Sequence, residues 1–203
     1  AKFFIETAWA ELPSVSAAVR TVSESLAALP LHVYKRGADN ARDRDPTHPA
    51  HVLLHDQANP WTSAVELRQQ LTFDALVAGN GYGLIIRVRN RPRELHRLDP
   101  STTTVDLTGT EPVYKVSRNN TVSDYSWRDI LHIRAPLSHG GVTGRSPVLR
   151  AREAICVGLA LETHAAGLFG NGARPSGVLE HPNKLTPEAL ASLRSSWNDA
   201  HTG

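Results

Sequence analysis

Apolar residues recur every three or four positions near the start of the chain, and this spacing predicts an amphipathic helix over residues 14–28. The residues on its apolar face are Val15, Val19, Val22 and Leu26. Pro30 is placed to end the helix, because proline cannot continue the backbone hydrogen bonding. The next residues alternate between apolar and polar, so a strand is expected over residues 31–34, followed by a polar loop over residues 37–49.

A second apolar stripe begins just after residue 62. Ser63 and Glu66 have the spacing of a capping box, in which each side chain accepts a hydrogen bond from the other residue's backbone. The stripe that follows at helical spacing consists of Leu67, Leu71, Ala75 and Ala78. The glycines of Gly79-Asn80-Gly81 should close this helix. A strand is then expected over residues 82–88.

Short apolar runs separated by turn residues continue along the chain. They predict four strands, over residues 94–98, 103–107, 113–116 and 130–134. These strands stand together between helices and do not alternate with them, which favours an α+β fold.

The longest expected element is a single helix that begins at Pro147. Ser146 is a good N-cap, and proline suits the first helical position because its missing N–H would have no partner there. Gly170-Asn171-Gly172 provides residues that tolerate a left-handed C-cap. The helix is rich in alanine and glycine, which allow another helix to approach closely. A strand over residues 177–179 and a last helix over residues 187–199, capped by Thr186, complete the pattern.

The candidate catalytic motifs fail on inspection. The glycines of residues 79–83 do not form G-x-G-x-x-G, because Leu84 occupies a position that requires glycine, and the expected order of helix then strand is the reverse of a phosphate loop. They are interpreted as a structural turn. No G-x-x-x-x-G-K-[ST] occurs, so the chain is not a P-loop motor. Cys156, between Ile155 and Val157, is expected to be a buried apolar residue. We expect no enzyme activity and no cofactor.

Three histidines, His48, His51 and His55, are spaced by three and four residues around a short helix expected over residues 50–55. This spacing can place imidazoles on one helical face, which zinc would require. A metal-dependent hydrolase or nuclease that uses these residues is therefore the alternative function. No HExxH motif or cysteine pair accompanies them. We favour the interpretation that the apolar residues 52–54 make this segment a packed cover, with no metal bound.

Composition narrows the class of protein. The 203 residues are 40% hydrophobic and 21% charged, as in ordinary globular domains, and no apolar run reaches the ~18 residues that span a membrane. With 22 basic and 20 acidic residues the net charge is only +2, which argues against a protein that grips DNA through its phosphates. A single cysteine excludes an internal disulfide.

Four cations lie in or near the long helix and the turn after it. They are Arg150, Arg152, Arg174 and Lys184. They are candidates for contacts with DNA in a channel or with a neighbouring subunit. Ion pairs to Glu153, Glu162 or a neighbouring chain are the favoured interpretation, given the small net charge.

Several blocks of the sequence together resemble the HK97-type portal proteins of tailed phages and prophages. They occur in the order of that family between about residues 14 and 197. The blocks are LAALPLHVY (26–34), HPAHVLLHDQANPW (48–61), GNGYGLIIR (79–87), ELHRLDPSTT (94–103), DILHIRA (129–135) and GARPSGVLEHPNKL (172–185). Each block alone is a weak signal, but six in order are a strong one.

The resemblance implies a structural subunit of a ring of about twelve copies at one capsid vertex, as in that family. Residues 1–145 would form a wing-like α+β domain, residues 146–172 a stem-like helix, and residues 173–203 the start of a clip. The implied partners are further copies of the chain, the large terminase subunit, head-completion proteins, the major capsid protein, and double-stranded DNA that passes through without sequence specificity. The implied location is the virion, with assembly in the bacterial cytoplasm.

The chain contains no methionine and no initiator. We therefore expect it to begin after the true N-terminus, and we expect the rest of the clip, the second stem helix and the crown to follow Gly203. A non-ring adaptor that shares the wing is a third possible function, and it predicts a monomer even at full length.

Overall fold

The computed structural model describes residues 12–37, 39–136, 138–139, 141–170, 182 and 184–201. The chain divides into two compact units, the first ending at Ile155 and the second beginning at Cys156. The helices are α2 (Pro13–Ala28), α3 (Pro49–His55), α4 (Ala64–Val77), α5 (Pro147–Arg150), α6 (Arg152–Gly170) and α7 (Pro187–His201). None of the described helices has the length and apolar character needed to cross a bilayer.

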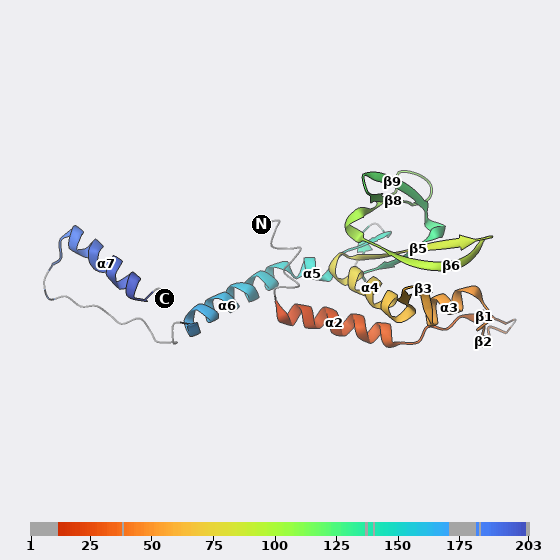
Figure 1. Ribbon diagram of the computed structural model, residues 1–203, viewed down its shortest axis with the longest axis horizontal. Helices are drawn as coiled ribbons and strands as arrows, with labels where there is room; N and C mark the ends of the chain where they lie inside the picture. Colours follow the sequence, from red (N-terminus) through yellow and green to blue (C-terminus); the bar gives the residue numbers. More distant parts are fainter. Residues whose placement is uncertain are drawn as a thin grey trace. The chain divides into compact units, whose positions relative to one another are not determined.

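The strands are short and antiparallel. They are β1 (Tyr34–Arg36), β2 (Arg42–Arg44), β3 (Gln57–Asn59), β4 (Thr62–Ser63), β5 (Asn80–Val88), β6 (Arg91–Leu98), β7 (Thr103–Asp106), β8 (Val113–Arg118), β9 (Thr121–Ser126), β10 (Ile130–Arg134), β11 (Ser138–His139) and β12 (Thr143–Gly144). Two sheets of three strands organise the first unit, with strand orders β10-β5-β6 and β7-β8-β9. Figure 1 shows α4 on one side of the β5–β6 pair and the β8–β9 pair on the other.

Helix α4 is the centre of the first unit, and its start confirms the predicted capping box. Ser63 Oγ accepts a hydrogen bond from Glu66 N at 3.2 Å, and Glu66 Oε2 accepts one from Ser63 N at 2.8 Å. Its apolar stripe packs into a core cluster that consists of Leu53, Ala58, Leu67, Leu71 and Leu95. Ala78, which was expected to extend the stripe, is exposed because it lies beyond the last helical residue.

Arg68 ties three helices together. Its Nη2 donates to the backbone oxygen of Ala27 at 2.7 Å, and its Nη1 donates to the backbone oxygen of Leu54. Both acceptors lie in the last turns of α2 and α3, where helical carbonyls have no partner within their own helix. One side chain on α4 therefore holds the ends of two neighbouring helices.

The second sheet contains a strand that the sequence pattern did not predict. Residues 121–126 form β9, an exposed edge strand that pairs with β8 and lacks an apolar stripe. The turn before it consists of Asn119 and Asn120, both with positive φ, as in the two-residue turns that join antiparallel strands. This sheet packs on the first through a cluster of Tyr82, Tyr114 and Ile130.

The region between α2 and α3 differs from the expectation. The strand expected over residues 31–34 begins only at Tyr34, and the expected polar loop contains β2, which pairs with β1 in register Lys35↔Asp43. All six residues of these two strands are exposed. Without a buried face the hairpin has no alternating apolar pattern, so the pattern could not reveal it.

The single long helix expected from Pro147 is interrupted. Ser146 caps its start as predicted, because its Oγ accepts from Leu149 N at 3.0 Å. At Ala151 the backbone has φ −84° and ψ 8°, which separates α5 from α6. No glycine or proline marks this residue. Cys156 is exposed on α6, so the prediction that it is buried is wrong.

The last helix agrees with its predicted start. Ala189 N donates to Thr186 Oγ1 at 3.3 Å, which confirms Thr186 as the cap of α7. The strand predicted over residues 177–179 lies outside the described residues, as do Asn171 and Gly172 of the predicted C-cap.

Candidate functional site

The four cations expected at a channel or subunit interface lie on different elements. Arg150 ends α5 and Arg152 begins α6, and both are exposed. Lys184 is exposed ahead of α7, and Arg174 lies outside the described residues. In the described part of the chain neither Arg150 nor Arg152 forms an ion pair. Their contact with DNA or with a neighbouring chain stays a prediction.

The alternative function requires His48, His51 and His55 to lie together, and the structure does not bring these three residues together. The Nδ1 atom of His48 accepts a hydrogen bond from Ala50 N at 3.1 Å and so caps α3. His51 and His55 lie instead beside His32, which comes from the segment between α2 and β1. The prediction that His48 belongs to this cluster is wrong, because its imidazole caps the N-terminus of α3.

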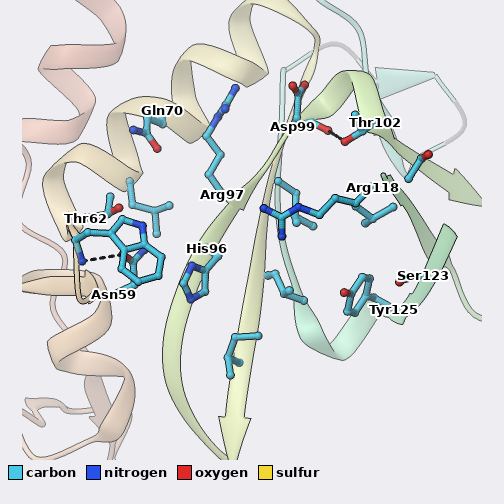
Figure 2. Close-up of a pocket in the computed structure, with 17 residues that line it drawn as sticks. Asn59, Thr62, Gln70, His96, Arg97, Asp99, Thr102, Arg118, Ser123 and Tyr125 are labelled. Atoms are coloured by element: carbon cyan, nitrogen blue, oxygen red, sulfur yellow. Dashed lines mark hydrogen bonds between the residues drawn. The ribbon is translucent and has the colours of Figure 1, made fainter. Parts of the chain in front are cut away.

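A groove of about 910 Å³ lies between the two sheets and the start of α4. Figure 2 shows Arg118 extending from the β8 side toward β6, which carries His96 and Arg97. Trp61 stands at the rim with 73% of its surface exposed, and its indole lies 5.4 Å from the His96 ring. The groove therefore combines an exposed aromatic side chain with cationic side chains.

The described lining of the groove is neutral or cationic except at one residue. Asp99 is the one carboxylate among the described residues that line it. It accepts hydrogen bonds from Ser101 N at 2.9 Å and Ser101 Oγ at 2.8 Å, which lower its pKa and fix it as the cap of a short 3₁₀ turn. Since this carboxylate is already engaged, it is not poised as a general base.

Arg97 is positioned by a buried carboxylate at the edge of the groove. Its Nε and Nη2 atoms donate to Asp74 at 2.7 Å each, in a bidentate pair. The Asp74 side chain is 4% exposed and that of Arg97 is 37% exposed. Burial raises the pKa of Asp74, while the hydrogen bonds to that carboxylate raise the pKa of Arg97.

This difference in exposure predicts that removing Arg97 and removing Asp74 lower the free energy of unfolding by different amounts. Arg97→Ala should lower the free energy of unfolding by about 3–5 kcal/mol, because it leaves a buried carboxylate without its partner. Asp74→Ala should cost less, because Arg97 can turn to water. Urea unfolding of both variants measures the two costs. Equal costs would mean that the buried carboxylate is solvated in some other way.

A second polar cluster joins the first sheet to the segment that leads into α5. His132 Nε2 lies 3.0 Å from Asn80 Oδ1, and its Nδ1 lies 3.1 Å from the Tyr114 hydroxyl. Asn80 Oδ1 only accepts hydrogen bonds, so the His132 proton is on Nε2 and Tyr114 donates to Nδ1. The same Asn80 oxygen accepts from Gly144 N at 2.7 Å. This neutral network clamps residue 144 to the first residue of β5.

Burial, with a smaller effect from Arg134, lowers the pKa of His132 to about 4. The unfolded chain therefore binds more protons than the folded chain between pH 6.5 and pH 4, and stability falls as the pH falls through this window. The full loss is about 3 kcal/mol, since one pKa unit is worth about 1.4 kcal/mol. Urea unfolding from pH 7 to pH 4 should show this slope, and His132→Gln should remove it. A slope that persists in the variant would assign it to other groups.

The start of β5 approaches the neighbouring backbone closely enough to require glycine. Gly79 has φ +90°, and a Cβ there would lie 2.7 Å from Ser146 N. Its oxygen accepts from Ala135 N at 2.9 Å, and Ser146 Oγ donates to Leu76 O at 3.0 Å. Gly79 therefore allows close packing of the backbone in a structural turn, as predicted.

Helix α6 presents apolar residues to solvent on one face. Val157, Leu161 and Leu168 are 59%, 64% and 47% exposed. At ~100° per residue they fall within about 40° of one another around the helix axis. A flanking face carries the small residues Cys156, Ala160 and Gly167. We refer to Val157, Leu161 and Leu168 as the α6 stripe. A stripe of this kind is typical of a helix that packs against another helix.

Sequence reasoning missed the groove and the partner of the two α3 histidines. The groove forms between two sheets whose pairing the sequence does not reveal. Its one local signal is Trp61, an exposed aromatic residue in the turn Pro60-Trp61 between β3 and β4. His32 is 19 positions before His51 in an irregular segment, so helical spacing could not find it.

Comparison with known sequences gives consistent similarities. A family model described as phage portal protein matches residues 13–203. The probable portal protein of Streptomyces phage phiC31 is 29% identical over 205 residues, covering 95% of this chain and 44% of that protein. The portal protein of Enterobacteria phage HK97 is 29% identical over 186 residues, covering 90% and 43%. This chain therefore spans less than half the length of these relatives.

Solved structures share the fold. A chain from the neck of an empty gene transfer agent particle, computed with C6 symmetry, has a TM-score of 0.71 and 26% identity, covering 95% of this chain and 54% of that chain. An HK97 family phage portal protein from Corynebacterium diphtheriae has a TM-score of 0.64 and 16% identity, covering 97% and 60%. The second is a similarity of fold alone. Both confirm the α+β class.

Proposed function

The chain belongs to the phage portal protein family, and from this premise we propose that it is a subunit of a closed ring at one capsid vertex. We propose about twelve copies, because a related gene transfer agent neck was computed with C12 symmetry. The ring encloses a channel through which double-stranded DNA enters the capsid during packaging and leaves it at infection. The subunit's role is structural, and a separate terminase hydrolyses ATP.

The observation that carries this proposal is the α6 stripe. Three large apolar side chains exposed along one helical face favour a covering partner, since burying them is favourable by roughly 25 cal/mol per Å². In a ring, each α6 is covered by neighbouring subunits. The small residues beside the stripe let the helices approach closely.

The division into wing, stem and clip is part of the same proposal. The wing is residues 1–145 and meets the capsid, the stem is residues 146–172 and borders the channel, and the clip begins at residue 173. The chain spans less than half of the length of the two portal relatives, and we propose the rest of the clip, a second stem helix and a crown for the remainder.

The polar network around His132 then has a mechanical role. It joins the wing to the segment that enters the stem, because Asn80 holds Gly144 two residues before the cap of α5. Ser146 adds a second link through its hydrogen bond to Leu76 O. A joint fixed by several partly buried hydrogen bonds transmits force between the two parts instead of yielding to it.

The proposed partners follow from the vertex position. They are neighbouring copies of the chain, the major capsid protein, the large terminase subunit during packaging, and head-completion proteins afterwards. The ring assembles in the bacterial cytoplasm and remains in the virion. Arg150, Arg152, Arg174 and Lys184 are the proposed contacts with DNA or between subunits.

A conduit predicts weak DNA affinity. DNA must slide through the channel, and each strong contact between a cation and a phosphate would add a barrier to that movement. The net charge of +2 suits this requirement. Full-length protein should bind duplex DNA with a Kd above about 1 µM at physiological salt, and the affinity should fall further as salt rises. Fluorescence anisotropy measures it. Sub-micromolar, salt-resistant binding would contradict a conduit.

A further inference from the structure

Three imidazoles from two separate segments meet at one place on the first unit. His51 and His55 lie one turn apart on α3, and His32 comes from the irregular segment before β1. The His32 ring centroid lies 4.7 Å from that of His55 and 6.1 Å from that of His51, and the His51 and His55 centroids are 5.0 Å apart. One ring nitrogen of each histidine lies within 4.8 Å of those of the other two.

A hydrogen bond sets the tautomer of one of these rings. His55 Nδ1 lies 3.0 Å from the backbone oxygen of Leu31. A carbonyl oxygen only accepts, so the proton is on Nδ1 and the lone pair of His55 is on Nε2. Metal-binding histidines in proteins use the same arrangement, in which a carbonyl orients the ring through one nitrogen and the other binds the ion. Leu31 is also adjacent to His32, so this bond links both segments of the cluster.

The geometry suits a small ion. Zinc–nitrogen bonds of about 2.0–2.1 Å place tetrahedral ligand atoms about 3.3 Å apart. The three nitrogens reach that separation through rotation of side chains that are all partly exposed. The same exposure leaves a fourth position open to water. His51 and His55 have the i, i+4 spacing by which two histidines on one helical face bind zinc.

We propose that His32, His51 and His55 form a site for a divalent transition-metal ion of the zinc class. The ion fixes the segment before β1 to α3 and so holds the β1–β2 hairpin, whose strands are otherwise exposed. The described carboxylates do not join the three histidines, so no general base is assigned to the site. This inference rests on the three histidines and Leu31 and does not depend on ring formation.

Cobalt and zinc are the probes. Co²⁺ reports tetrahedral coordination through its visible absorption, and calorimetry with Zn²⁺ gives affinity and stoichiometry. The protein used in these titrations is prepared without a polyhistidine tag. The expected result is saturation at about one ion per chain with a tetrahedral cobalt spectrum, and His32→Ala or His55→Ala should each weaken binding at least ~10-fold.

His48→Asn provides a matched control. It removes an imidazole from the N-cap of the same helix and keeps a side-chain acceptor that can cap, so it should bind zinc as the unmodified chain does. Zinc should also raise the Tm of this control and leave that of His32→Ala unchanged. No tetrahedral cobalt spectrum at saturating ion, or equal losses in the His32 and His48 variants, would overturn the proposal.

Discussion

Replacing Leu161 with aspartate is expected to leave the full-length protein folded and to abolish ring formation. Leu161 is 64% exposed in the centre of the α6 stripe, so the substitution disturbs few contacts within the part of the chain that the structure describes. In a ring the same carboxylate would be buried at every subunit contact, where an unpaired charge is strongly unfavourable. A loss of only 1.4 kcal/mol per contact lowers each association constant about tenfold, and a closed ring multiplies that loss. Analytical ultracentrifugation at a fixed concentration separates rings from monomers.

Glu162→Lys is the control for this experiment. It changes the charge by two units at the next residue, which is exposed and points about 100° away around the helix. Rings should persist in this variant. If Leu161→Asp formed rings as readily as the unmodified protein, the α6 stripe would not lie in the subunit contact and the main argument for the ring would fail.

The second large effect is expected at Gly81 in β5. A Cβ at this position would overlap the Leu71 carbonyl oxygen and lie 2.9 Å from its carbonyl carbon. Both are backbone atoms of α4, so no side chain can move aside. Gly81→Ala should therefore lower the free energy of unfolding by about 3 kcal/mol or leave the first unit unable to fold. Urea unfolding followed by far-UV circular dichroism measures the loss.

Gly83 allows a matched comparison on the same face of the same strand. A Cβ there would meet Leu131 Cβ at 3.5 Å and Leu71 Cδ1 at 3.6 Å, both ordinary contacts with side chains. Gly83→Ala should change the free energy of unfolding by less than about 1 kcal/mol. Similar losses in the two variants would show that α4 and β5 do not approach as closely as described.

Elements with local signals could be predicted from the sequence. The capping box at Ser63 and Glu66 marked the start of α4, and the buried residues Leu67 and Leu71 followed from helical spacing. Ser146 and Thr186 marked two further helix starts. In each case the determinant lies within a few residues of its effect.

Elements without a buried face could not be predicted in this way. The strand β2 is exposed, and in the edge strand β9 Tyr125 alone is partly buried, so neither strand carries an alternating apolar pattern. For β9 the pair Asn119-Asn120 was a usable signal, because both residues tolerate the positive φ that a two-residue turn requires. Cys156 is exposed on a helix whose covering partners are proposed to be other chains, so its apolar neighbours suggested a core that the described residues do not contain.

The candidate sites depend on segments that are distant in the sequence. Helical spacing placed His51 and His55 side by side, as the structure does, but it also selected His48, which caps α3. The third imidazole of the cluster, His32, is placed by the path of the chain from α2 to β1. The groove around Arg97 depends on the packing of two sheets, and no pattern within either sheet contains that information.

The most direct test of the central claim is electron microscopy of the full-length protein, with the subunits counted in single particles. The account predicts closed rings of about twelve subunits with an open centre. A uniform population of monomers at micromolar concentration would contradict it and would favour a non-ring adaptor that shares only the fold.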